Sequence, residues 1–233
     1  MSAKRLPGKP LLKINGLSII SHVSKKAEEA NIGDVIVATE DQEIIDDVKS
    51  NGFNAILTSN QHKTGTDRIH EALNKSNIKD VDFIMNLQGD EPAIEIQDII
   101  NLNGKMVKNR FNIGTLAATI KDDINLKNKN IVKVITEKSL EESSFPKAVS
   151  FLRKSEKIGN IYHHIGIYCY SKDTLKKFVK LSQSKNEIEN RLEQLRALDN
   201  NIDINVSLAK SSPIGVDTEE DYLALKKIME YKN

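Results

Sequence analysis

Asn86-Leu87-Gln88-Gly89-Asp90-Glu91-Pro92 is the stretch that decides the fold class of this chain. It follows Val81 to Met85, an apolar run that only Asp82 interrupts and that is typical of a buried strand. In an open α/β sheet, ligands bind outside the carboxyl ends of the strands. A hard carboxylate on a tight turn at that place can hold Mg²⁺, which usually arrives with phosphate. The stretch therefore indicates a nucleotide site, and a plain solvated turn is the alternative.

Outward from this stretch, short apolar runs alternate with amphipathic stretches. Strands are predicted at 35–39, 55–57, 83–87, 114–120, 132–136, 148–152, 165–170 and 202–208. Helices are predicted from Asp41 to Gly52, at 66–75, at 187–198 and from Thr218 onward, where Tyr222, Leu225, Ile228 and Met229 form the apolar face. Strand followed by helix, repeated, predicts an α/β fold with a mostly parallel mixed sheet and helices on both faces. We expect one domain over 1–233, with a β-rich sub-lobe at roughly 114–170 that serves dimerisation or sugar binding.

Composition excludes several classes of protein. The 233 residues have a formal net charge of +1 with both signs mixed along the chain, which argues against a nucleic-acid binder. No run of about 18 apolar residues predicts a membrane span, and the start lacks the apolar core of a signal peptide. The single cysteine, Cys169, is expected to be a small buried residue. We expect a cytoplasmic protein with no nucleic-acid or membrane partner.

The opening residues form a cationic loop. Lys4, Arg5 and Lys9 surround Gly8, which stands between two prolines. Glycine lets backbone N–H groups approach phosphate oxygens, and the prolines stiffen the loop. Three cations there would neutralise a triphosphate; a basic, solvated tail is the alternative.

A second loop, Gln61 to Arg68, leads directly into a helix. Helix N-termini attract anions through unpaired N–H groups and the macrodipole. Thr66 is the expected N-cap and Arg68 lies in the first turn. Phosphate binding is one interpretation, and a capped helix with a surface arginine is the other.

Of two further polar patterns, the first suits a hydroxyl-rich acidic ligand. On the predicted strand, His164, Gly166, Tyr168 and Tyr170 share one face. Adjacent histidines alone are not a metal site, since no third ligand stands at zinc-like spacing. The second pattern is the polar set Glu193, Gln194 and Arg196 on the helix at 187–198. A half-exposed sheet face and a solvent-facing helix surface are the ordinary alternatives.

A second carboxylate, Asp217, stands in Gly215-Val216-Asp217-Thr218, just before the last helix. That helix begins with a capping-box pattern in which Asp221 takes the place of the usual glutamate. Asp217 and Asp90 would form the two-carboxylate half of a Mg²⁺ shell, leaving the other positions to water and phosphate oxygens.

Six motifs follow one another in a specific order. They are Arg5-Leu6-Pro7-Gly8-Lys9-Pro10, Thr64-Gly65-Thr66-Asp67-Arg68, Asn86 to Pro92, His164-Ile165-Gly166-Ile167-Tyr168, Leu192-Glu193-Gln194-Leu195-Arg196 and Gly215-Val216-Asp217-Thr218. This order resembles the 3-deoxy-manno-octulosonate cytidylyltransferase (CMP-Kdo synthetase) family from residue 4 to about 225. The related CMP-sialic acid synthetases share the fold but lack this set.

The resemblance implies a nucleotidyltransferase fold of the Rossmann-like type and a homodimer. It also implies that CTP and Kdo are converted into CMP-Kdo and pyrophosphate for lipopolysaccharide biosynthesis. The implied cofactor is Mg²⁺, held by Asp90 and Asp217. The implied catalytic residues are Lys9, Asp90 and Asp217; the nucleotide-binding residues are Arg5, Lys9, Arg68 and Gln88; and the sugar-binding residues are Gln88, Arg153, His164, Tyr168, Glu193 and Gln194. Arg153 and His164 would pair with the Kdo carboxylate.

The chain departs from the family pattern at its start. The family begins with an apolar strand that ends in a phosphate-binding arginine, just upstream of the position of Met1. Ala3 and Glu40 replace a serine and an aspartate, and the surroundings of Arg153 differ. Because neighbours of a missing central strand would have unpaired edges, we expect the chain as given to be unstable or aggregation-prone and to bind CTP poorly. Equal melting temperature and CTP affinity with and without the added strand would contradict this expectation.

Three alternatives stay open at this point. The first is CMP transfer to another acidic sugar, such as 8-amino-Kdo or a sialic-like acid, and competition between purified sugars would separate these. The second is a non-catalytic nucleotide-binding relative that lacks the first strand. The third is a protein-interaction module, which predicts a large exposed apolar patch, whereas the apolar residues here follow core periodicity.

Overall fold

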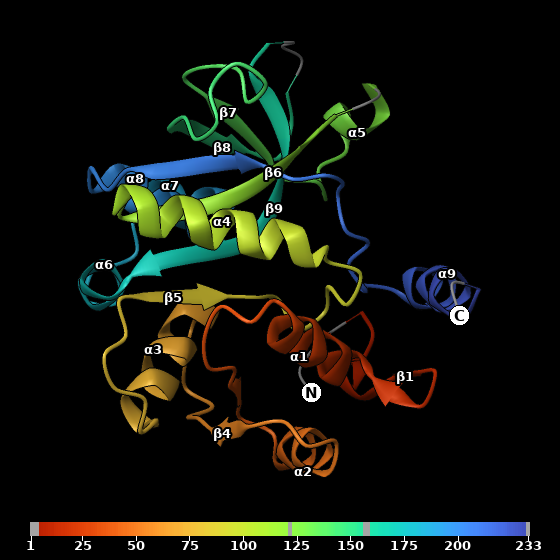
Figure 1. Ribbon diagram of the computed structural model, residues 1–233. Helices are drawn as coiled ribbons and strands as arrows, with labels where there is room; N and C mark the ends of the chain where they lie inside the picture. Colours follow the sequence, from red (N-terminus) through yellow and green to blue (C-terminus); the bar gives the residue numbers. More distant parts are fainter. Residues whose placement is uncertain (1–4, 121–122, 156–158, 232–233) are drawn as a thin grey trace. The chain divides into compact units, whose positions relative to one another are not determined.

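The computed structural model describes residues 5–120, 123–155 and 159–231 (Figure 1). Ala3 and Lys4 lie outside the described residues. The chain divides into two compact units. Unit 1 comprises Met1–Lys79, Leu87–Ile99 and Pro213–Asn233, and unit 2 comprises Asp80–Asn86 and Ile100–Ser212. The expectation of a single domain over 1–233 stays a prediction.

Unit 1 contains small sheets and the helices around them. Its elements are η1 (Lys9–Leu11), β1 (Lys13–Ile14), β2 (Leu17–Ser18), α1 (Ile19–Glu29), β3 (Val37–Thr39), α2 (Gln42–Ser50), β4 (Ala55–Leu57), α3 (Gly65–Lys75) and α9 (Glu219–Glu230). β1 and β2 form an antiparallel hairpin, and β3 pairs with β4 in parallel. The hairpin turn uses Asn15 and Gly16, both with positive φ, as a tight two-residue turn requires.

One core cluster of unit 1 joins three distant segments of the chain. Ile14, Ile19, Val216 and Leu225 are fully buried in it, and Leu6, Leu12, Ala93, Tyr222 and Met229 pack against them. These apolar residues are close in sequence to Lys9, Asp90 and Asp217. Because Leu6, Ala93 and Val216 pack in one cluster, the backbone positions of the three nearby charged residues are fixed relative to one another.

Unit 2 is built on a six-stranded sheet. Its elements are β5 (Phe83–Asn86), α4 (Ile96–Asn109, which begins in unit 1), β6 (Ile113–Thr119), α5 (Asp123–Lys127), β7 (Lys133–Thr136), β8 (Ala148–Leu152), β9 (Ile161–Ser171), α6 (Lys172–Phe178), α7 (Lys185–Asn190), α8 (Leu195–Asp199) and β10 (Ile204–Leu208). The strand order is β10-β6-β9-β7-β8, and β5 also pairs with β9. Figure 1 shows α4 lying across β6 and β9. A Cβ on Gly114 of β6 would meet the Met106 sulfur at 2.6 Å, so this glycine permits the close approach of α4.

The predicted α/β class with a mixed sheet is confirmed, and each predicted strand is present with small shifts at its ends. The expected dominance of parallel pairs differs from the structure. Among the described residues of the six-stranded sheet, only β6 and β10 pair in parallel. The long strand β9 pairs antiparallel with β5, β6 and β7, and β7 pairs antiparallel with β8. Apolar runs of similar composition suit both kinds of pairing, so strand direction depends on the path of the connections.

Two helix predictions need correction. The helix expected at 187–198 is two short helices, α7 and α8, because Arg191 adopts a left-handed conformation with φ 53°. The N-cap of α3 is Thr64 rather than Thr66, since the Thr64 oxygen accepts from the Asp67 N–H and Thr66 is buried. The capping box at Thr218 and Asp221 is confirmed, whereas Ile228 on that helix is 41% exposed rather than part of the apolar face.

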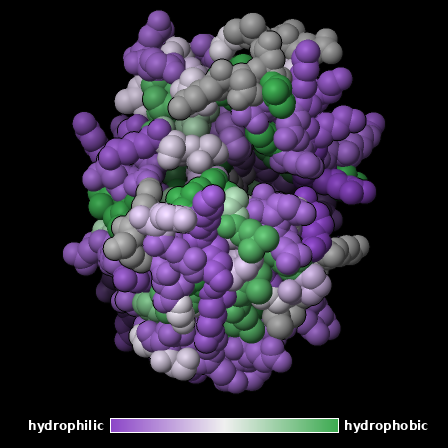
Figure 2. Space-filling view, turned by 90° about the vertical axis from the view of Figure 1, so that its right-hand side faces the viewer, coloured by the Kyte–Doolittle hydropathy of each residue, from purple (hydrophilic) through white to green (hydrophobic). Residues whose placement is uncertain are grey.

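Among the described residues, no helix is both long and apolar enough to cross a membrane. Figure 2 shows polar side chains over much of the face it presents, with apolar residues in patches between them.

Candidate functional site

The ammonium group of Lys9 is the centre of a polar cluster in unit 1. Its Nζ donates to Asp90 Oδ2 at 2.5 Å, to the Val216 carbonyl at 2.9 Å and to Asp217 Oδ1 at 3.2 Å. Asp90 and Asp217 are 81 and 208 residues away from Lys9 along the chain. The two predicted metal-binding carboxylates therefore approach a single cation.

Backbone geometry places Lys9 at this point. Gly8 has φ 72°, a left-handed conformation that suits glycine, and Pro10 lies in the first turn of η1. The Leu11 N–H closes the turn onto the Gly8 carbonyl at 2.9 Å. The loop thus turns sharply and directs Lys9 toward the segments that contain Asp90 and Asp217.

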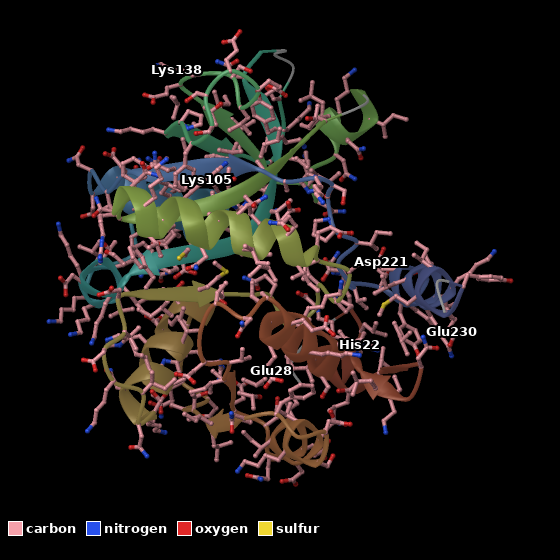
Figure 3. All side chains as sticks on the ribbon, in the orientation of Figure 1. His22, Glu28, Lys105, Lys138, Asp221 and Glu230 are labelled. Atoms are coloured by element: carbon pink, nitrogen blue, oxygen red, sulfur yellow. The ribbon has the colours of Figure 1, made fainter. Side chains whose placement is uncertain are left out.

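The two carboxylate segments are bonded to each other and to α9. The Val216 N–H donates to the Asp90 carbonyl at 2.9 Å. Figure 3 labels Asp221 at the start of α9, where its carboxylate accepts from the Asp217 N–H at 3.1 Å and from the Thr218 N–H at 2.9 Å. The capping box therefore also orients the backbone of Asp217.

The charge state of Lys9 follows from competing effects. Burial lowers the pKa of Lys9, but hydrogen bonds and attraction from Asp90 and then Asp217 outweigh it, so the pKa is raised. Lys9 is therefore charged at neutral pH. Arg5 adds a second cation, with Nη2 at 2.9 Å from Asp217 Oδ2. Both partners of this pair are more than half exposed, so the pair adds little stability and Arg5 can turn to another anion.

Glu91 is a third carboxylate of this region that the sequence patterns did not single out. Its Oε2 atom is buried and has no hydrogen-bond partner among the described residues. Burial, then the charges of Asp90 and Asp217, raise the pKa of Glu91 to about 8. Glu91 is therefore mostly protonated at neutral pH. Burial is the larger cause, and the negative charges of Asp90 and Asp217 add to it by repelling a third negative charge.

Replacing Glu91 with Gln should change how stability depends on pH. The folded chain keeps the Glu91 proton up to about pH 8, whereas an unfolded chain loses it near the ordinary value of 4.5. Stability from this residue is therefore present at low pH and lost as pH rises through this window. Between pH 5 and pH 8 in the absence of Mg²⁺, we expect the free energy of unfolding of the wild type to fall by on the order of 3 kcal/mol relative to that of Glu91→Gln. Urea unfolding at each pH measures this difference.

Glu95→Gln is the matched control for this measurement, since Glu95 is exposed and belongs to the same segment. The free energy of unfolding of this control should follow that of the wild type at each pH. A Glu91→Gln curve parallel to the wild type would contradict the assignment of a raised pKa to Glu91.

Arg68 forms a separate cluster in unit 1. Its guanidinium forms an ion pair with Glu40 and donates to Thr58 Oγ1 at 2.6 Å and to the Ser59 carbonyl at 3.3 Å. Burial lowers the pKa of Arg68, with a smaller opposing effect from Glu71. From the start of α3, Arg68 therefore contacts the segments that follow β3 and β4. The predicted nucleotide contact of Gln88 stays a prediction; its carbonyl accepts from the Glu91 N–H at 3.2 Å.

His164 and Tyr168 lie side by side on β9 in unit 2. Their ring centroids are 5.5 Å apart. The centroid of the Phe151 ring lies 5.0 Å from that of His164, and these two rings pack edge to face. Burial, and then the nearby His163, lower the pKa of His164 to about 3. His164 is thus uncharged at neutral pH and acts only as a neutral hydrogen-bonding group. The predicted contact of His164 with a sugar carboxylate stays a prediction.

Tyr168 and Glu193 are close enough to affect each other. Burial, then Tyr170 and Glu193, raise the pKa of the Tyr168 hydroxyl, so this hydroxyl keeps its proton and remains a donor. The chain of rings continues from Tyr168 to Tyr170 at 5.9 Å, which confirms the shared face predicted from the sequence. Cys169, in contrast, is buried, and burial raises the pKa of its thiol to about 12, as expected of an inert residue.

Arg153 caps a helix in unit 2. Its guanidinium donates to the carbonyls of Asn190 and Arg191, each at 3.1 Å, and of Lys129 at 3.4 Å. Cations are stabilised at helix C-termini, and this contact explains why α7 ends where it does. Three of the five guanidinium donors are used in this way. The predicted contact of Arg153 with a sugar carboxylate stays a prediction.

Arg196 is the largest departure from the expected solvent-facing position on the helix. Its side chain is 3% exposed and makes a two-point contact with Glu187, with Nε–Oε2 2.8 Å and Nη2–Oε1 2.5 Å. The guanidinium also lies over the Phe178 ring at 4.7 Å. Gln194 is buried beside it, and Glu193 Oε1 is 3.9 Å from Arg196. Arg196 is buried because α7 packs against α8 and places Glu187 beside it.

The oxygen donors around Lys9 fit a magnesium ion. Carboxylate and carbonyl oxygens are the hard ligands that Mg²⁺ takes, and here they already face one cation. Among residues 5–120, 123–155 and 159–231, no group of three or more His, Cys, Asp or Glu forms a metal cluster. A bound Mg²⁺ would therefore complete its shell with water and phosphate oxygens, as it usually does.

Comparisons with known proteins identify the family of this chain. A family model described as cytidylyltransferase matches residues 1–204. The 3-deoxy-manno-octulosonate cytidylyltransferase of Rhizobium etli is 38% identical, over 98% of this chain and 92% of that protein. The protein of the same name from Afipia carboxidovorans is 40% identical, over 98% of this chain and 93% of that protein. The chain belongs to the 3-deoxy-manno-octulosonate cytidylyltransferase family.

Solved structures support the fold of this family. A CMP:2-keto-3-deoxy-manno-octonic acid synthetase solved in complex with CTP superposes with a TM-score of 0.89 at 32% identity, covering 99% of this chain and 95% of the other. The apo structure of UDP-glucose pyrophosphorylase superposes with a TM-score of 0.73 at 14% identity, covering 99% and 95%, which shows a shared fold alone. The nucleotidyltransferase fold and the enzyme class predicted from the motifs are both confirmed.

Proposed function

We propose that this chain transfers CMP from CTP to Kdo, forming CMP-Kdo and pyrophosphate for lipopolysaccharide biosynthesis. The observation that carries this proposal is the convergence of Asp90 and Asp217 on the Lys9 ammonium, in a member of the cytidylyltransferase family. Phosphoryl transfer needs little covalent chemistry from a protein and depends on positioning and charge neutralisation. A cluster of two cations and two carboxylates in unit 1 has the residue types for that task.

Within unit 1, the nucleotide residues divide into two roles. Lys9 is charged and held by three oxygens, so it is a fixed positive group for the triphosphate. Arg5 is exposed and free to turn from Asp217 to a phosphate. Arg68 and Gln88 would add contacts to the nucleotide. In this proposal Asp90 and Asp217 hold Mg²⁺, which supplies charge neutralisation at phosphate oxygens and lowers the pKa of a nearby hydroxyl.

The reaction itself is a single displacement. The anomeric hydroxyl oxygen of Kdo attacks the α-phosphorus of CTP, a new P–O bond forms, and the bond to the β-phosphate oxygen breaks. Pyrophosphate leaves with the bonding electron pair, and the hydroxyl proton passes to solvent. Lys9 and Arg5 stabilise the negative charge that gathers on the departing group.

Apart from Gln88, which belongs to unit 1, the residues proposed for the sugar belong to unit 2. Tyr168 keeps its proton and donates, and His164 is neutral. Glu193 accepts from sugar hydroxyls, and Gln194 both donates and accepts. Arg153 is the cation proposed for the Kdo carboxylate. The family resemblance further supports a homodimer located in the cytoplasm.

The deciding assay is release of pyrophosphate by this chain with CTP, Mg²⁺ and one purified sugar at a time. We expect release with Kdo that exceeds release with 8-amino-Kdo or a sialic acid. If the chain prefers one of those two sugars, that sugar is the substrate instead of Kdo, and the proposed CMP transfer still holds. A folded chain that releases no pyrophosphate with any of them would contradict the proposed function and favour a non-catalytic nucleotide-binding role.

A further inference from the structure

The pairing of β6 with β9 is interrupted beside the proposed sugar residues. Leu116 pairs with Ile165, but the next residue of β6, Thr115, pairs with Tyr168. The register between the two strands shifts at this point, so Gly166 and Ile167 of β9 lie within a bulge, a feature that often redirects a side chain next to a functional site. Thr115 pairs with Tyr168, and His164 contacts both residues, so the three side chains lie on the same side of the sheet; β6 and β9 cross the centre of unit 2 in Figure 1.

The hydroxyl of Thr115 fills this bulge. Its Oγ1 lies 2.7 Å from the Ile167 carbonyl, 3.3 Å from the Ile165 carbonyl and 3.0 Å from Nε2 of His164. A carbonyl oxygen only accepts hydrogen bonds, and a hydroxyl has one hydrogen to donate. The close contact at 2.7 Å is attractive only if Thr115 donates that hydrogen to Ile167. The Thr115 oxygen must then accept from His164, so Nε2 of His164 bears the proton.

The other ring nitrogen follows from this assignment. A neutral imidazole has one donor and one acceptor nitrogen. Since Nε2 holds the proton, Nδ1 of His164 is an acceptor, and it has no hydrogen-bond partner among the described residues. Burial and the neighbouring His163 keep the ring uncharged. The ring is therefore prepared to accept a hydrogen bond from a neutral donor.

We propose that Thr115 is a positioning residue that fixes the tautomer of His164, so that Nδ1 accepts a hydrogen bond from a hydroxyl of the bound sugar. The sugar role of His164 rests on the proposed function, whereas the tautomer rests on the geometry of β6 and β9 alone. The chemistry that His164 recognises is then a hydroxyl group, because an ionised carboxylate has no hydrogen to give to Nδ1. Thr115 touches no ligand in this account and acts only through His164.

The first test reads the tautomer directly in the full chain without ligand. Long-range proton–nitrogen correlation spectra of protein labelled with ¹⁵N-histidine distinguish the two tautomers, and His164→Asn identifies the signals of His164 among the five histidines. We expect the Nε2–H form in the wild type and in Thr115→Ser, which keeps the hydroxyl. Thr115→Val keeps the shape but lacks the hydroxyl, and should show a mixture of tautomers. An Nδ1–H form in the wild type, or an unchanged spectrum in Thr115→Val, would overturn the proposal.

The second test separates positioning from loss of structure. In steady-state assays, Thr115→Val should raise the KM for Kdo about ten-fold while the KM for CTP changes less than about two-fold. Thr115→Ser should remain near the wild type in both. Equal loss for both substrates would show a merely structural role. If the wild type turns over no Kdo, the proposed function fails, and the spectra still decide whether Thr115 sets the His164 tautomer.

Discussion

Replacing Asp90 with Asn is expected to reduce pyrophosphate release from CTP and Kdo on the order of 10³-fold. Asparagine keeps the size of the side chain but removes the negative charge that lies 2.5 Å from the Lys9 ammonium. Lys9 then keeps Asp217 as its charged partner and the Val216 carbonyl as an acceptor. The proposed Mg²⁺ loses one of its two protein carboxylates. The loss should therefore appear in kcat, because charge neutralisation at the reacting phosphates is what the carboxylate supports.

The fold of the Asp90→Asn variant should be preserved. The segment is held by its backbone, through the bond from the Val216 N–H to the Asp90 carbonyl, and by the buried cluster around Val216. Asp34→Asn serves as the control, since Asp34 is an exposed aspartate in the same unit. Its activity should match the wild type, and the melting temperatures of all three proteins should be similar. Activity of Asp90→Asn within ten-fold of the wild type would rule out the assigned role of Asp90.

The largest effect on stability is expected from Arg196→Met. Both Arg196 and Glu187 have side chains less than 5% exposed, and they bond to each other at two points. Methionine fills much of the arginine volume but leaves the Glu187 carboxylate buried without its cation. Removing one partner of a buried pair in this way costs roughly 3–5 kcal/mol. We expect a loss of that size in the free energy of unfolding at pH 7.

The pH dependence of this loss has a defined sign. Burial raises the pKa of Glu187, but the hydrogen bonds from Arg196, and then from Gln183, outweigh it and lower the pKa. A carboxyl group with a lowered pKa stabilises the folded state above its ordinary value, and this contribution disappears as pH falls through the folded value. The gap between wild type and Arg196→Met should therefore be widest at neutral pH and should narrow in acid.

Two further variants make this measurement decisive. The double variant Glu187→Gln with Arg196→Met removes the buried charge and should recover a large part of the lost stability. Lys147→Met breaks an exposed pair, in which Lys147 Nζ lies 2.7 Å from Asp203, and should leave the free energy of unfolding close to that of the wild type. A loss in Arg196→Met no larger than in Lys147→Met would show that burial of the pair adds nothing.

Local patterns were enough to predict many elements. The strands of unit 2 and the capping box at Thr218 depend on residues within a few positions of each other, so composition and spacing determine them. The predicted N-cap of α3, Thr66, was two residues away from the actual N-cap, Thr64, because the segment contains two threonines that both suit this position. The prediction of one helix at 187–198 was wrong for a different reason. The carbonyls at the end of α7 accept hydrogen bonds from Arg153, which directly follows β8 and is distant in the sequence.

The sequence by itself determined the enzyme class, through six ordered motifs, and the α/β class, through alternating strands and helices. Only the tertiary structure brought Lys9, Asp90 and Asp217 to one point, added the Val216 carbonyl to them and made Glu91 a protonated neighbour. Only the tertiary structure placed Thr115 against His164 and buried Arg196 with Glu187. Periodicity reports which face of an element is apolar, but hydrogen bonds and pKa values depend on distances between elements, and the packing of the folded chain sets those distances.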